Sequence, residues 1–302
     1  MIPPVPNNDL RIELPSDLLT AGDLVGRAVR IGRANWLALG RFFLAPTAVY
    51  WLAIPCAFWD PDTYTNEFSP AANLWIWVLG FLFIFLAIWD LSVRKFALIY
   101  YLAGISDSVE EGLKKAQKKM WPILLVTLPV LLFEVCENVL SIISTKLGAL
   151  SGGVTDALAF WELWLTALEF VLLLPFLWVI MLNAYYIAFI VFEESSIAKA
   201  AGRFWSLSMQ DGMYVALSLT LMSLVYFCAG GPIIAVLALE ILLPKEAVWY
   251  FLGGIGSAVL AGPLDAFMTA VITVCGALLY QQVWARREGR DLLKKLQLLE
   301  VK

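Results

Sequence analysis

The sequence predicts an all-α fold, a polytopic membrane bundle of six transmembrane helices. Of its 302 residues, 61% are hydrophobic and only 15% are charged, whereas soluble domains carry about a quarter charged residues. A single aqueous core cannot bury this apolar excess, so the lipid bilayer has to serve as the solvent. A second observation, the uneven distribution of Lys and Arg, orders the helices across the membrane. A third, a recurring amphipathic pattern, divides the chain into three repeats.

Six segments are long and apolar enough to cross the roughly 30 Å hydrocarbon core of a bilayer. They cover residues 37–58, 74–101, 122–144, 160–192, 213–243 and 263–284 of a membrane domain predicted over 18–285. Prolines inside four spans, Pro46, Pro129, Pro175 and Pro232, each leave a carbonyl group without its helical donor. In lipid a neighbouring group has to satisfy that carbonyl, so the prolines predict kinks within a packed bundle.

The basic residues predict the orientation of the spans. Of the 21 Lys and Arg residues, only Lys146 and Lys245 fall in the loops on one side of the membrane. The others, including the pair Arg94 and Lys95, are assigned to the opposite side, which the positive-inside rule identifies as the cytoplasm. We therefore expect a multi-pass protein of a cell membrane with both termini cytoplasmic. A tail over 1–17 has no signal-peptide core, and we expect it to be uncleaved.

A short amphipathic helix is predicted before each odd-numbered span. The apolar faces contain Leu24, Ala28 and Ile31 in the first, Val109, Leu113, Ala116 and Met120 in the second, and Ile197, Ala201 and Phe204 in the third. The cationic faces are expected to meet anionic headgroups and contain Arg27, Arg30, Arg33, Lys114, Lys115, Lys118, Lys119, Lys199 and Arg203. The spacing of these units predicts three repeats of an interfacial helix plus a membrane hairpin. A further amphipathic helix is predicted over 286–302.

Local signals refine this picture. Ser108 and Glu111 form a capping-box pattern at the start of the second amphipathic helix. The glycine-rich stretch 253–256 lacks a preceding strand and predicts a loop or a close helix contact rather than a nucleotide site. The four cysteines are widely separated in apolar surroundings and are expected to be isolated thiols. The net charge of −4 leaves no cationic excess for nucleic-acid binding.

Two motifs carry a resemblance to a known family. One is the basic, alanine-containing helix that ends in an aromatic residue, over 28–36 and 200–205; the other is the exit from the sixth span over 279–292. On these motifs the chain resembles the bacterial integral membrane proteins named after the membrane domain of glycerophosphoryl diester phosphodiesterases. Some relatives carry a fused phosphodiesterase barrel, which is not found in this sequence. The resemblance therefore implies a bacterial plasma membrane and no phosphodiesterase chemistry.

Polar residues inside the predicted spans are the candidates for a functional site, since buried ionisable groups face a bundle interior or a watery cavity. They are Glu134, Glu137, Asn138, Glu169, Asn183 and Asp265. The first three share one helical face by their spacing of three and four residues. They indicate either a proton or solute pathway or a set of interhelical hydrogen bonds. The chain contains no histidine, and we recognise no catalytic, cofactor-binding or metal-binding constellation.

Two roles follow as hypotheses from different classes. The first is a non-enzymatic membrane scaffold or accessory subunit, whose amphipathic helices either lie on anionic headgroups or dock to a protein partner at the cytoplasmic face. The second is a small solute, proton or lipid transporter that uses the intramembrane carboxylates. A carboxylate-based lipid enzyme is a third alternative.

Overall fold

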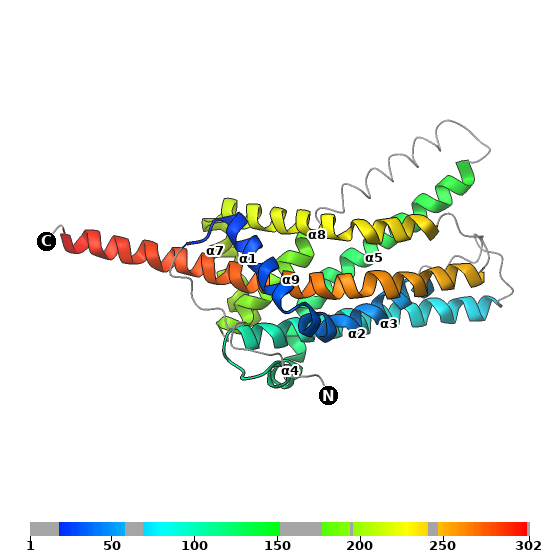
Figure 1. Ribbon diagram of the computed structural model, residues 1–302, viewed down its shortest axis with the longest axis horizontal. Helices are drawn as coiled ribbons and strands as arrows, with labels where there is room; N and C mark the ends of the chain where they lie inside the picture. Colours follow the sequence, from blue (N-terminus) through cyan, green and yellow to red (C-terminus); the bar gives the residue numbers. More distant parts are fainter. Residues whose placement is uncertain (1–17, 58–68, 152–176, 194–195, 241–246, 301–302) are drawn as a thin grey trace.

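A computed structural model describes residues 18–57, 69–151, 177–193, 196–240 and 247–300, and this part of the chain is helical without strands. The helices are α1 (Ala21–Ala34), α2 (Trp36–Ala57), α3 (Pro70–Leu102), α4 (Val109–Gln117), α5 (Met120–Ser151), an unlabelled helix (Leu177–Phe192), α7 (Ile197–Gln210), α8 (Gly212–Glu240) and α9 (Ala247–Glu300). The predicted all-α fold class is therefore confirmed (Figure 1).

Several of these helices can cross a membrane. By length and composition α2, α3, the stretch Gly212–Ala229 of α8 and the stretch Phe251–Arg287 of α9 each suffice. Two further spans result if each of two bent pairs counts as one: α4 with α5, bent by 91°, and Leu177–Phe192 with α7, bent by 119°. The described chain thus has four to six candidate spans, as expected of a multi-pass membrane protein.

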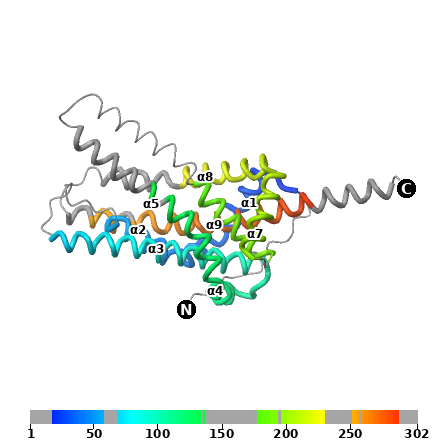
Figure 2. The backbone as a smooth tube through the Cα atoms, turned by 180° about the vertical axis from the view of Figure 1, so that it is seen from behind, coloured from blue at the N-terminus to red at the C-terminus, as the bar shows by residue number. Residues whose placement is uncertain are grey.

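The helix α9 is the centre of the arrangement, because α1, α2, α3 and α8 all pack against it. Figures 1 and 2 show α1, α4 and α7 gathered toward one end of the bundle, which we call the basal end. The opposite end, where α3 starts and α2 finishes, is the distal end. One continuous helix, α9, replaces the separately predicted sixth span and C-terminal helix.

Close helix approaches depend on glycine at two positions of α9. Gly254 lies against the ring of Pro55 on α2, so the glycine-rich stretch 253–256 is part of a helix and makes a close helix contact. At Gly276 an added Cβ would lie 2.7 Å from the backbone of Ala184. Small residues of this kind let backbones approach in membrane bundles, where packing replaces the hydrophobic effect as the driving force.

The first amphipathic helix packs lengthwise on α9. Leu19, just before α1, bonds to Gln282 and Arg286, whereas Gly32 near its end meets Phe267 and Val271. Thirteen residues of helix rise about 20 Å, which matches the length of α9 between these contacts. The predicted apolar residues Leu24 and Ala28 are buried in this interface. The apolar face of α1 is therefore covered by protein.

In α4 and α7 the apolar faces also turn toward the protein, with two corrections. Met120, predicted on the apolar face of the second amphipathic helix, lies beyond α4 at the start of α5 and is exposed. Val109 and Ala116 of α4 are buried against α3, as the pattern predicts. In α7 the predicted Ala201 is exposed, and its neighbour Ala200 is buried instead, together with Leu207. Phe204 keeps its predicted place on this face through ring contacts with Tyr185, Tyr186 and Phe189. Only the alanine position of the predicted stripe therefore changes. The threefold repeat stays a prediction.

Helix starts follow the capping signals. Ser108 accepts a hydrogen bond from the Glu111 backbone N–H at 3.1 Å, which confirms half of the predicted capping box. The Glu111 carboxylate reaches back to the N–H of Asp107 at 2.9 Å rather than to that of Ser108. Ser69 caps α3 in the same way, ahead of Pro70 at the first helical position.

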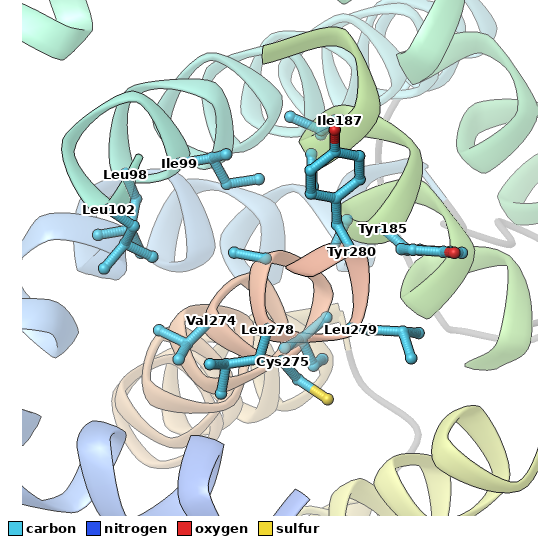
Figure 3. Packing of buried hydrophobic residues seen from close by; sticks show 14 of the residues in the cluster. Leu98, Ile99, Leu102, Tyr185, Ile187, Val274, Cys275, Leu278, Leu279 and Tyr280 are labelled. Carbon is cyan, nitrogen blue, oxygen red and sulfur yellow. The ribbon is translucent and has the colours of Figure 1, made fainter. Parts of the chain in front are cut away.

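The largest buried core lies toward the basal end. Figure 3 shows Leu98, Ile99 and Leu102 of α3 facing the segment of α9 that carries Val274, Leu278 and Tyr280. Tyr185 and Ile187, on the helix Leu177–Phe192, approach the same segment from another side. The ring centroids of Phe189 and Tyr280 are 4.8 Å apart in an edge-to-face contact. Three chain segments distant in sequence are thereby fixed together.

Candidate functional site

One polar side chain from each of the four long apolar helices meets in a single group, of which Lys95 is buried and the other three are half-buried. Tyr226 on α8 donates its hydroxyl hydrogen to Oδ1 of Asp265 on α9 at 3.0 Å. Lys95 on α3 is within electrostatic range of the same carboxyl group. The indole of Trp51 on α2 lies beside it, although its Nε1 has no partner with hydrogen-bond geometry among the described residues. These four residues, Trp51, Lys95, Tyr226 and Asp265, are called the polar cluster below.

Charge balance explains how the polar cluster can be buried. Only 7% of the Lys95 surface is exposed, and an isolated buried ammonium group is strongly destabilising unless an opposite charge is near. The Asp265 carboxylate provides that charge, and the Tyr226 hydroxyl satisfies one of its oxygens. The cluster therefore links α3, α8 and α9 electrostatically, with α2 in contact.

Asp265 lies in the interior of a helix rather than at the start of one. The predicted sixth span starts at residue 263 and places Asp265 at its opening, but α9 begins at Ala247 and continues through both positions. Pro263 is thus an interior proline, which a membrane helix tolerates when neighbouring groups satisfy the freed carbonyl. Of the predicted intramembrane candidates, Asp265 is the one that joins the polar cluster.

Next to Lys95, Arg94 donates a hydrogen bond to a carbonyl group of α2 that Pro46 leaves without its helical donor. Pro46 has no N–H, so the carbonyl group of Phe42, four residues earlier, has no donor within α2. Arg94 Nη1 donates to this carbonyl, and its guanidinium lies 5.2 Å from the centroid of the Phe42 ring. Asp90 holds the arginine in place through a 2.9 Å bond from Nε. The predicted compensation of Pro46 by a neighbouring group is confirmed.

Asn183 has a structural role. Its Nδ2 donates to the carbonyl oxygen of Val126 at 2.7 Å and so joins the helix Leu177–Phe192 to α5. Val126 lies in the turn of α5 that precedes Pro129. On the neighbouring helix pair, the hydroxyls of Thr127 and Ser92 are 3.0 Å apart and join α5 to α3. For the intramembrane polar residues the sequence indicates either a proton or solute pathway or a set of interhelical hydrogen bonds. The bonds of Asn183 and Thr127 are of the second kind.

The remaining acidic candidates fall largely outside the described residues. Glu134, Glu137 and Asn138 belong to α5 and share one face by their helical spacing, but their side chains are not part of the description. Glu169 lies outside the described ranges altogether.

The predicted headgroup-facing cations divide into two groups. Most are exposed: Arg30, Arg33, Lys114, Lys118, Lys119 and Lys199. Arg27 and Lys115 are half-buried, and Lys115 is committed to protein through a 2.8 Å ion pair with Glu111 and a bond to the carbonyl of Ile105. Arg203 pairs with the largely buried Glu193 at 3.0 Å.

These two ion pairs shift the titration of their members. The hydrogen bond from Lys115, followed by that from the Asp107 N–H, lowers the pKa of Glu111 below its ordinary value. The hydrogen bond to Glu193 and the charge of that carboxylate raise the pKa of Arg203. Both effects favour the charged forms, so the pairs persist at neutral pH.

Sequence reasoning missed three members of the polar cluster. Arg94 and Lys95 were counted together as cytoplasmic cations, although both lie within the apolar stretch predicted over 74–101. A lysine inside a span faces the bundle interior as a rule, and this signal was available. Trp51 and Tyr226 gave no signal, because aromatic residues are common throughout the spans.

The cluster offers one carboxyl, one amine and one phenol. No group of three or more metal-ligating side chains occurs within the described ranges. The arrangement is suited to cross-linking helices or to holding a proton in the bundle. Comparison with known proteins adds no assignment: no family model, no curated protein and no solved structure matches the chain.

Proposed function

We propose that this multi-pass membrane protein is a scaffold or accessory subunit whose basal end faces the cytoplasm. The observation that carries the proposal is the division of α7 into three faces. Ala200 and Leu207 pack on the protein, Lys199 and Arg203 form a cationic face, and an exposed apolar face contains Trp205, of which 64% is exposed. A helix that only packed on its own bundle would need one apolar face.

The start of α5 repeats this combination at the same end of the molecule. Trp121 is 74% exposed, Met120 is exposed beside it, and Lys118 and Lys119 precede them. Exposed tryptophan next to lysine is typical of the level of anionic headgroups. We propose that these surfaces anchor the basal end on the cytoplasmic leaflet and offer a protein partner a rigid docking face.

Three further expectations belong to this proposal. They are the threefold repeat of interfacial helix and hairpin, the cytoplasmic location of both termini in a bacterial plasma membrane, and membership of the family resembling the membrane domain of glycerophosphoryl diester phosphodiesterases. The accumulation of cations on α1, α4 and α7 supports the orientation.

The test compares co-purification from native membranes in mild detergent. We expect a stoichiometric partner to accompany the wild-type chain and to be lost from the variant Trp205→Ser combined with Met209→Ser. Leu82→Ser with Leu86→Ser, at positions that are also exposed (47% and 46%) but distal, is the control and should retain the partner. Wild-type preparations that are reproducibly free of any stoichiometric partner would remove the support for a scaffold.

A second function, a proton-coupled or solute transporter, is favoured by the polar cluster. A carboxyl group and an amine buried between four candidate spans are the groups that proton relays in membranes use. This proposal predicts that Asp265→Asn abolishes flux in proteoliposomes while the helical circular dichroism is retained. Glu134→Gln with Glu137→Gln tests the second set of acids in the same assay, and unchanged flux in both variants would dispose of the transporter.

A further inference from the structure

Hydrogen-bonding groups to which the described residues offer no partner of full hydrogen-bond geometry gather between α8 and α9 toward the basal end. One of them, the Tyr214 hydroxyl, lies within electrostatic range of Arg286. The atoms are paired one turn apart on each helix and shielded from solvent; they are Tyr214 Oη and Ser218 Oγ on α8, and Gln282 Nε2 and Arg286 Nε on α9. Ser218 and Gln282 are fully buried. Native folds contain few such groups, because each destabilises the fold unless water or a ligand satisfies it.

Two contacts bring these groups together and fix their positions. The guanidinium carbon of Arg286 lies 3.9 Å from the centroid of the Tyr214 ring. The backbone of Leu19 is held on both sides, its N–H by Gln282 Oε1 at 2.8 Å and its carbonyl by Arg286 Nη2 at 2.7 Å. The free Nε2 of Gln282 and Nε of Arg286 are therefore already ordered before any ligand binds, which lowers the entropic cost of binding.

The site lies at the level where both helices leave their apolar stretches. Tyr214 is in the first turn of the candidate span Gly212–Ala229, and Arg286 is next to the last residue of Phe251–Arg287. The exposed Met213, with 87% of its surface accessible, adjoins the site on α8. In a bilayer this is the boundary at which lipid headgroups meet the hydrocarbon core.

The chemistry of the four groups selects the ligand. Tyr214, Ser218 and Gln282 can all donate hydrogen bonds, and Arg286 adds a donor and a positive charge, the combination that binds phosphate oxygens. Asp211 is in electrostatic range of Tyr214, and its negative charge disfavours a doubly charged anion. We propose that this site binds a singly charged phosphate group, the phosphodiester of a membrane phospholipid.

This inference requires only that α8 and α9 span the membrane, so it stands or falls separately from the scaffold role. The experiment is native mass spectrometry of the full chain in detergent, titrated with short-chain phosphatidylglycerol, with inorganic phosphate as the second arm. We expect one lipid to bind the wild-type protein. The variant Tyr214→Phe with Ser218→Ala should bind about twenty-fold more weakly, since each lost neutral hydrogen bond is worth roughly five-fold in affinity.

Matched variants keep the test decisive. Arg286→Gln should abolish binding, but it also frees Leu19, so the Tyr214 and Ser218 variant carries the conclusion. Tyr186→Phe removes a tyrosine hydroxyl that bonds to the Ile197 carbonyl and should bind lipid like the wild type. Equal lipid affinity in all variants would overturn the site, and binding of inorganic phosphate in preference to the lipid would overturn the lipid assignment.

Discussion

The two halves of α3 are both apolar and have opposite surroundings. In the distal half, where Ile84 is a buried exception, most large side chains are exposed: Leu74, Trp75, Trp77, Val78, Leu79, Phe81, Leu82, Phe83 and Leu86. In the basal half Phe96, Leu98, Ile99 and Leu102 are buried among other helices. Apolar composition therefore predicts that a segment is shielded from water. It does not predict whether lipid or other helices surround that segment.

The helix α9 repeats this contrast. Leu252, Val259 and Leu260 near its distal end are exposed, whereas almost every residue from Ala266 to Val283 is buried. The transition occurs close to Asp265, and on α3 it occurs between the exposed Leu86 and the buried Ser92, about one helical turn before Lys95. The polar cluster thus lies near the border between the distal half of the bundle, whose side chains face lipid, and the basal half, whose side chains pack against other helices.

The largest effect expected from this comparison concerns core packing. Leu98→Ala should destabilise the protein by about 2–5 kcal/mol, because it opens a cavity in a fully buried site. The matched change Leu82→Ala should cost far less, since lipid fills the space left at a site that is 47% exposed. Thermal unfolding in nanodiscs, followed by circular dichroism, measures both. Equal losses of stability would show that the side chains of the distal and basal halves have the same kind of surroundings.

Glycine substitutions sharpen the same contrast at a smaller scale. Gly276→Ala should destabilise by about 1–3 kcal/mol, because the new methyl group meets the backbone near Ala184, which cannot rotate away. Gly256→Ala meets nothing within 4 Å and should stabilise by up to about 1 kcal/mol through helix propensity. The unfolding assay used for Leu98 and Leu82 reports both. A stable Gly276 variant would contradict the close packing of α9.

At the border, a double-mutant cycle tests the link between Arg94 and Pro46. Arg94→Met should destabilise the protein by about 1–3 kcal/mol, because the Phe42 carbonyl is then buried without a donor. In a Pro46→Ala background the restored N–H of residue 46 satisfies that carbonyl, so Arg94→Met should cost less. Additive effects of the two changes would argue that Arg94 acts through Asp90 alone.

The smallest effect is the pH dependence of the exposed helix α4. The pKa of Glu111 is lowered in the fold, so its contribution is present above the unfolded pKa and is lost as pH falls through the folded value. The protection of α4 amides against hydrogen exchange, corrected for the intrinsic slowing of exchange in acid, should therefore fall on acidification below about pH 4.5, the ordinary value of a Glu. In Glu111→Gln that loss of protection should disappear; its persistence would assign the effect to another group.

Much of the fold follows from the sequence. Hydropathy places α2, α3 and α8 to within a few residues, Ser108 marks the start of α4, and Pro46 predicts a carbonyl that needs a donor. These features depend on local chemistry, which a single segment contains in full.

What the sequence does not contain is the rotation and continuity of each helix. Ala200 and Ala201 are chemically identical, and only the neighbours of α7 decide which is buried. Lys95 and Arg94 are adjacent cations in one apolar stretch, and the sequence does not state that Lys95 faces Asp265 whereas Arg94 bonds to a carbonyl group of α2. Pro263 resembles a helix start, but packing against α2 continues α9 through it. Such features depend on tertiary contacts between distant segments.

Collision of a nitroxide side chain with molecular oxygen and with a water-soluble nickel complex tests the contrast between the halves most directly. In a cysteine-free background with the protein in a bilayer, a label at Leu82→Cys should collide often with oxygen and rarely with nickel, as a lipid-facing site does. A label at Ala97→Cys, two residues after Lys95 in the basal half, should be shielded from both. Strong nickel collisions at Leu82, or oxygen collisions at Ala97 equal to those at Leu82, would contradict the division of the bundle.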